Sequence, residues 1–133
     1  MDWFDIETAL EAATAETGVY YFGWERPDGT ILTIYIGRGF GARGIRKRVL
    51  DHINGTSAGS SCLNQVVAHG GDRVLVRWEE SADEDDEGRA FDEFEADWGE
   101  GLRPPCVRRR ALARLPNPRW PASWLDTWPE DEG

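Results

Sequence analysis

Two β-prone segments joined by a short turn place the strongest limit on how this chain can fold. The segments VYYFGWE (19–25) and TILTIYIG (30–37) are rich in β-branched and aromatic residues, and the letters RPDG stand between them. Proline at the second position of RPDG and glycine at the fourth are typical of a tight turn. We therefore predict an antiparallel hairpin built from these two segments.

The length of the turn decides which residues of the hairpin face each other. Facing residues in an antiparallel pair have numbers that sum to a constant. A four-residue loop over 26–29 gives a sum of 55 and places Tyr20 opposite Tyr35. A three-residue loop over 27–29 gives a sum of 56 and places Tyr21 opposite Tyr35. The residues of the turn by themselves leave both registers open.

Amphipathic patterns predict four helices and one further strand around the hairpin. The helices are expected over 4–15, 44–54, 60–71 and 89–99, and the third strand over 73–80. The order α-β-β-α-α-β-α predicts an α/β fold, in which a small three-stranded sheet, antiparallel or mixed, is flanked by helices. We expect one domain over 1–119, followed by a tryptophan-containing segment over 120–133 that ends in an acidic tail.

Charge is unevenly distributed along a chain whose formal net charge is −10. Residues 79–100 carry twelve acids and one cation, whereas 38–48 carries five cations and 103–119 carries six, both without any acid. A strongly acidic protein is ordinarily a poor candidate for binding nucleic acid. Two basic segments that converge in the fold would nevertheless form an electropositive cleft that the net charge conceals.

Two of the predicted helices carry charged residues at the border of their apolar faces. Arg48 and His52, four residues apart, lie on one side of the helix that follows the hairpin, although this spacing also fits an ordinary amphipathic helix with a solvated cationic flank. In the last helix, Glu95 lies on the same side as Phe94 and Trp98. An unpaired carboxylate on that apolar side would be energetically costly. Glu95 is therefore expected either to pair with Arg48 or to bind a metal ion.

Other patterns bear on the membrane, the compartment and the cysteines. No apolar run approaches 18 residues, so we predict no membrane span. The N-terminus MDWFDIETAL has acids where a signal peptide needs cations, so we expect a cytoplasmic protein. Cys62 and Cys106 lack metal-ligand spacing, and we expect both to be reduced.

Together these residues resemble a known family. The tripeptides GVY (18–20) and YIG (35–37), followed by Arg48, His52 and Glu95, are similar to the motifs of the GIY-YIG nuclease domain. That family includes homing endonucleases, some restriction enzymes and the 3′-incising domain of bacterial excision repair.

The resemblance extends over most of the chain, from residue 18 to about residue 107. It favours the register that places Tyr20 opposite Tyr35, because family members have both motif tyrosines in the active site. Val107 stands where the family commonly has an asparagine near that site.

The resemblance implies a metal-dependent endonuclease that hydrolyses phosphodiester bonds. Glu95 would hold one Mg²⁺ or Mn²⁺, and Tyr20 would accept the proton of the attacking water. Arg48 would clamp the scissile phosphate, while Tyr35 and His52 would orient the water, the phosphate or Tyr20. Tyrosine needs neighbouring cations to become a usable base, and Arg38 and Arg48 are the cations available for this role.

The remaining cations would contact flanking phosphates, which gives affinity without sequence information. They are Arg43, Arg46, Lys47, Arg108 and Arg109, although the arginines at 108–110 could equally neutralise the acids of 79–100. We expect DNA in preference to RNA as the substrate, with a homodimer or a partner protein supplying specificity. An RNA-cleaving nuclease, or an inert module of the same fold that binds nucleic acid or protein, is the alternative.

Overall fold

The computed structural model describes residues 2–56, 61–81, 83–100 and 103–107. The elements in chain order are β1 (Phe4–Asp5), α1 (Ile6–Ala12), β2 (Gly18–Glu25), β3 (Ile31–Gly39), α2 (Gly44–Asn54), α3 (Ser61–Gly70), the 3₁₀ helix η1 (Gly71–Arg73), β4 (Val74–Glu80) and α4 (Asp86–Trp98). The predicted α/β class and the order of the long elements are confirmed. The sheet has four strands rather than three, in the order β1-β4-β2-β3, and every neighbouring pair is antiparallel.

The additional strand β1 comes from the start of the segment that was predicted as a helix. Phe4 pairs with Val76 of β4, and its ring stacks on Trp78 with 5.0 Å between the centroids. The side chain of Asp5 then accepts a hydrogen bond of 2.7 Å from the backbone N–H of Thr8, which caps the first turn of α1. The cap sets the start of α1 at Ile6, so the helix is shorter than the predicted span.

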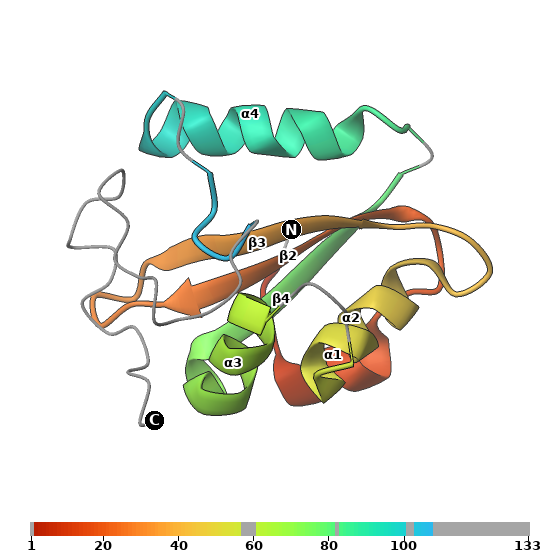
Figure 1. Cartoon of the computed structure of the whole chain (residues 1–133), viewed down its shortest axis with the longest axis horizontal. Helices are drawn as coiled ribbons and strands as arrows, with labels where there is room; N and C mark the ends of the chain where they lie inside the picture. The colour runs from red at the N-terminus through yellow and green to blue at the C-terminus, as the bar shows by residue number, and fades with distance from the viewer. Residues whose placement is uncertain (1, 57–60, 82, 101–102, 108–133) are drawn as a thin grey trace.

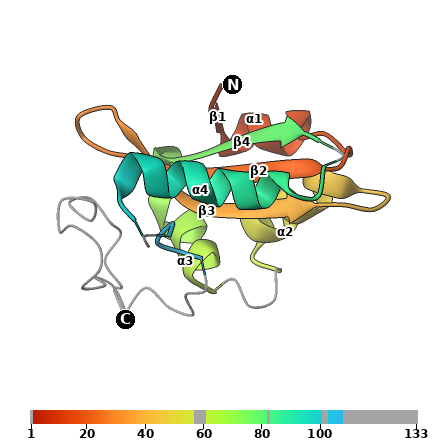
Figure 2. The same ribbon diagram turned by 90° about the horizontal axis from the view of Figure 1, so that it is seen from above.

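The sheet lies between two layers of helices. α1, α2 and α3 cover one face, and α4 covers the other (Figure 1). Seen from above, α4 lies across β2 and β3 (Figure 2). β2 is a central strand, and seven of its eight residues are buried. A strand covered on both faces reads as a continuous apolar run, which explains the sequence VYYFGWE.

The hairpin of β2 and β3 changes register along its length. Next to the turn, Glu25 pairs with Ile31, and the N–H of Arg26 donates to the carbonyl of Thr30 at 2.8 Å. These pairs sum to 56, as the three-residue loop requires. Beyond the shift between Phe22 and Gly23, the sum becomes 57. The register of 55 that the family resemblance favoured is therefore wrong.

Ile34 is the extra residue of a β-bulge in β3. Phe22 faces Tyr35 and Gly23 faces Thr33, so Ile34 between them has no facing residue in β2. Its carbonyl accepts a hydrogen bond of 2.8 Å from the N–H of Cys106, so the segment 103–107 is fastened to β3 at the bulge. Cys106 is buried and disulfide-bonded, and the prediction that it is reduced is wrong.

In the described part of the chain, none of the helices has both the length and the apolar composition that crossing a membrane would require.

Candidate functional site

Four of the predicted catalytic residues meet on the face of the sheet that α2 covers. We call this set the phenol–imidazole cluster; its members are Tyr20, Tyr35, Arg48 and His52. Tyr20 is 1% exposed and His52 is 0% exposed, and the Tyr20 hydroxyl lies 2.8 Å from His52 Nε2 in a hydrogen bond. The ring of Tyr35 lies 4.9 Å from that of His52 and 6.1 Å from that of Tyr20, centroid to centroid.

The register of the hairpin brings the two tyrosines together diagonally rather than directly. Tyr20 faces Gly37, and Tyr35 faces Phe22, so the two rings lie on the same face two positions apart. The predicted common face is confirmed, although the predicted pairing is not. Gly37 leaves the space that Tyr20 needs, because a Cβ at Gly37 would lie 2.4 Å from the Tyr20 hydroxyl oxygen.

α2 supplies the other two members of the cluster, as its spacing predicts. The helix spans the predicted residues, and Gly55 ends it with a left-handed φ of 73°. Ile45, Val49 and His52 are buried against the sheet, while Arg48 is half-buried at the border. Burial disfavours the charged form of Arg48, but the phenols of Tyr20 and Tyr35 outweigh that cost and raise the pKa of Arg48.

Burial also determines the protonation of Tyr20 and His52. It raises the pKa of Tyr20 well above its ordinary value; Tyr35 adds to that rise, and Arg48 only partly opposes it. Burial, together with the charge of Arg48, lowers the pKa of His52 from 6.5 to about 4, while Asp51 opposes this shift. At neutral pH the protein therefore holds a protonated phenol beside a neutral imidazole. Tyr20 in this state is a poor acceptor for a proton from water.

One nitrogen of the imidazole lacks a partner in the described part of the chain. Nδ1 of His52 is buried and makes no hydrogen bond there, while Nε2 bonds to Tyr20. The Tyr20 hydroxyl can donate to Nε2 only in the tautomer that carries its proton on Nδ1. A buried polar atom without a partner is unfavourable, so packing rather than hydrogen bonding holds this ring in place.

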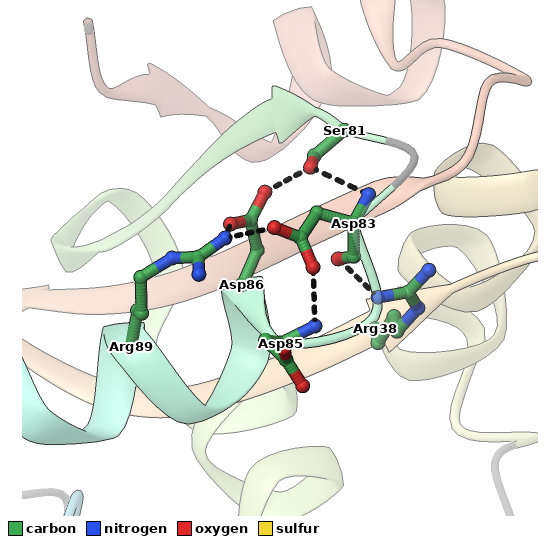
Figure 3. A network of polar contacts seen from close by, with 6 residues as sticks. All are labelled: Arg38, Ser81, Asp83, Asp85, Asp86 and Arg89. Carbon is green, nitrogen blue, oxygen red and sulfur yellow. Dashed lines mark hydrogen bonds and ion pairs between the residues drawn. The ribbon is translucent and has the colours of Figure 1, made fainter.

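Arg38 is the predicted catalytic residue that the fold does not bring to the cluster. Arg38 lies in β3 and pairs with Val19 of β2. It is one residue beyond Gly37, so its side chain points to the face of the sheet opposite the cluster. Its Nη1 donates a hydrogen bond of 2.6 Å to the backbone carbonyl of Asp83 (Figure 3).

The loop that accepts the hydrogen bond from Arg38 contains a local network of charged residues at the start of α4. Arg89 pairs with the carboxylates of Asp83 and Asp86, and Ser81 also hydrogen-bonds to Asp86 (Figure 3). Part of the acidic stretch is therefore neutralised within the chain itself.

Glu95 lies in α4, on the helix that covers the face opposite α2 (Figure 1). It is half-buried, whereas Glu93 and Asp97 are exposed and line a small cavity between α4 and the sheet. No ion pair of the described residues joins Glu95 to Arg48. The predicted salt bridge is therefore not formed here.

The described residues contain no group of three or more His, Cys, Asp and Glu side chains arranged to hold a metal ion. Of the predicted set, Glu95 alone has a donor that Mg²⁺ prefers. A single carboxylate holds Mg²⁺ weakly, and water and substrate oxygens would have to complete the coordination. The described residues therefore do not by themselves form a complete Mg²⁺ site.

The outer face of α2 carries the predicted phosphate-binding cations around a groove of about 440 Å³. The groove is lined by Ala15, Arg43, Arg46, Lys47, Leu50, Asp51 and Asn54. Lys47 forms an ion pair with Asp51 at 2.9 Å, so part of its charge is compensated. Asp51 was missed in the sequence, although its position four residues after Lys47 is a recognisable helical ion-pair spacing.

The start of α2 is bound to the end of α1. Arg46 Nη1 donates to the carbonyl of Ala13 at 3.3 Å, and the backbone N–H of Arg46 donates to Thr14 at 2.7 Å. The N–H of Ile45 likewise donates to Glu16 at 3.0 Å. The first amides of α2 are thus already paired, and Arg46 serves mainly to join the helices. Arg43 is exposed on the groove, and the predicted contacts of Arg108 and Arg109 lie outside the described residues.

The chain matches no family model, no curated protein and no solved structure. The resemblance to the GIY-YIG domain depends on the motif residues in the sequence.

Proposed function

We propose that this chain is a GIY-YIG-like nuclease that hydrolyses phosphodiester bonds, with DNA as its substrate. The observation that carries the proposal is the phenol–imidazole cluster. Its four members come from β2, β3 and α2, and they surround the Tyr20–His52 hydrogen bond of 2.8 Å. A buried phenol, imidazole and guanidinium in one place form an unusual arrangement for a purely structural core, which favours burial of apolar groups.

Arg48 is the group that we assign to the phosphate. It is half-buried at the solvent side of the cluster, and its planar guanidinium can donate two parallel hydrogen bonds to phosphate oxygens. Tyr35 is also half-buried and lies beside it, so its hydroxyl can orient the water or a phosphate oxygen. Tyr20 and His52 lie behind them and hold the guanidinium in position.

Tyr20 can accept the proton of water only after it has lost its own phenol proton, and that loss at neutral pH requires a lower pKa than the free protein provides. A divalent ion held by water and by the substrate would supply positive charge at the phosphate and at the leaving oxygen. Glu95 lies in α4, on the opposite face of the sheet from Arg48 (Figure 1), so the predicted role of Glu95 as the metal ligand of this cluster is not part of the proposal. We propose Mg²⁺ or Mn²⁺ for this role. Tyr20 would then serve as the base only in the substrate complex.

The test is an incubation of plasmid DNA and of a structured RNA with the purified protein, Mg²⁺ or Mn²⁺, and four variants. We expect Arg48→Ala and Tyr35→Phe to lose cleavage, whereas Glu95→Ala should keep it because Glu95 lies on the opposite face of the sheet (Figure 1). Arg38→Ala is the matched control, because it removes a guanidinium from the opposite face. Full activity of Arg48→Ala would show that the cluster is not the active site, and cleavage of RNA alone would reassign the substrate.

A second candidate function is supported by the electrostatics of Tyr20. Its buried, protonated phenol and the absence of an assembled metal site among the described residues also suit a module that binds nucleic acid without cutting it. Such a module would bind DNA in a manner that depends on Arg48 and would leave the plasmid intact with both metals. Turnover that Arg48→Ala abolishes would exclude it.

A further inference from the structure

Phe40 is the one large apolar side chain that the described part of the chain leaves strongly exposed, at 75%. It follows the last residue of β3 and precedes α2, in a loop that projects from the end of the sheet (Figure 1). An isolated exposed apolar residue is ordinary on a protein surface, so exposure by itself assigns nothing. Its surroundings are the informative feature.

The loop keeps open space around the ring. Glycines stand on both sides of Phe40, and Gly41 adopts a left-handed φ of 89° that disfavours any other residue. A Cβ at Gly41 would meet no atom within 4 Å. Nothing in this loop covers the ring, and the glycines allow a flat ligand to approach it closely.

Phe40 also lies between the two cationic parts of the proposed site. It comes directly after β3 and three residues beyond Gly37, which packs on the Tyr20 hydroxyl. An extended chain spans about 10 Å over three residues. Three residues further on, Arg43 begins the lining of the groove on α2. Arg43 and Arg46 keep this edge basic, although Lys47 is paired with Asp51 and Arg38 points to the opposite face.

An exposed aromatic ring beside a cationic track is how proteins hold single-stranded nucleic acid, because bases stack on the ring and the cations follow the backbone. Paired bases inside a duplex have no free face to offer. We propose that Phe40 is a stacking platform for an unpaired base, and that the preferred substrate is single-stranded or locally unpaired nucleic acid. The inference rests on the proposed function, since it concerns the substrate of that same site.

The test measures affinity rather than cleavage. A fluorescently labelled single strand and the duplex of the same sequence are titrated with the protein in EDTA, and binding is followed by anisotropy at several salt concentrations. We expect Phe40→Ala to weaken binding of the single strand by about five- to a hundredfold. Binding of the duplex and the slope of log affinity against log salt should not change, because no charge is removed.

Two further variants separate stacking from other effects. Phe40→Trp should restore the single-strand affinity, because it keeps a flat ring. Arg43→Ala should weaken both ligands and reduce the salt slope by about one, as a phosphate contact does. The melting temperature of Phe40→Ala should equal that of the parent, since the side chain is exposed.

The outcomes distinguish this inference from the nuclease proposal. Unchanged single-strand affinity in Phe40→Ala, or an equal loss for both ligands, would overturn the stacking role and leave the nuclease standing. Binding that depends on Phe40 without cleavage of any substrate would overturn the nuclease and keep the stacking role. A protein that binds neither ligand would overturn both.

Discussion

Tyr20 and Tyr21 are neighbours in β2, yet their rings lie on opposite faces of the sheet in two different environments. Each is buried beside an arginine, and burial raises the pKa of both phenols. Tyr20 hydrogen-bonds to His52, next to the half-buried Arg48. Tyr21 stacks against Arg77, whose Cζ lies 4.3 Å from the centre of its ring.

The two arginines differ in what surrounds their charge. Arg77 is held between Tyr21 and Trp3, and it lines a small cavity together with the carboxylates of Glu93 and Asp97. Arg48 has two phenols and an imidazole as neighbours, with Asp51 the carboxylate that acts on it. An incoming phosphate would meet repulsion at the α4 face and attraction at the α2 face. The comparison shows that local surroundings, rather than net charge, determine which face would attract an anion.

The largest expected effect is the loss of cleavage in Arg48→Ala. Removal of a preorganised charge contact at a reacting phosphate typically costs about 3–4 kcal/mol of barrier, or at least a hundredfold in rate. Arg77→Ala should lower the melting temperature and leave the rate per folded molecule nearly unchanged. Initial rates on plasmid and thermal melts of both variants measure this difference. Equal losses of rate in the two variants would remove the distinction between the faces.

Gly37→Ala is expected to destabilise the α2 face. Its new Cβ would lie 2.4 Å from the Tyr20 hydroxyl oxygen, and the buried ring has no free space into which to move. Overpacking of this kind costs about 1–3 kcal/mol. Urea unfolding measures the loss of free energy.

Gly88→Ala, in α4, is the matched control for Gly37→Ala. Its Cβ would meet no atom within 4 Å, and alanine favours helix by up to about 1 kcal/mol. An unchanged stability of Gly37→Ala would mean that Tyr20 is packed more loosely than the geometry indicates.

Acidification should destabilise the fold through His52. The pKa of His52 is about 4 in the folded protein against 6.5 ordinarily, so between these values the unfolded chain binds a proton that the folded chain does not. The free energy of unfolding therefore falls as the pH is lowered through this window, by about 2 kcal/mol between pH 7 and pH 5. In urea titrations at the two pH values, His52→Gln should lose this part of the pH dependence of stability. His69 is present in both the parent and the variant, so it does not contribute to the difference between them. The same pH dependence in both proteins would assign the effect to other groups.

The smallest effect is expected for Arg38→Ala. This side chain donates one hydrogen bond to the backbone carbonyl of Asp83 on the α4 face, and its loss should cost about 1 kcal/mol or less. Cleavage should be unaffected. A loss of activity comparable to that of Arg48→Ala would show that Arg38 reaches the substrate, and the two faces would then act together.

The sequence predicted the local elements of this protein and a part of the candidate site. Hydrophobic periodicity located α2 at 44–54, and the spacing of Arg48 and His52 correctly placed Arg48 at the border of its buried face, whereas His52 is fully buried. These features depend on residues close together along the chain, and the chain's own periodicity expresses them.

Only the tertiary structure decided the register, the burial of Tyr20 and the face of Arg38. The register depends on the bulge at Ile34, whose carbonyl is bonded to Cys106 from a remote part of the chain. A shift of one residue at this bulge sets which side chain stands opposite Tyr20, and alternation along β3 turns Arg38 away from Tyr35. The pKa of a phenol depends on how much of its surroundings is protein rather than water, and that is determined by packing between distant segments.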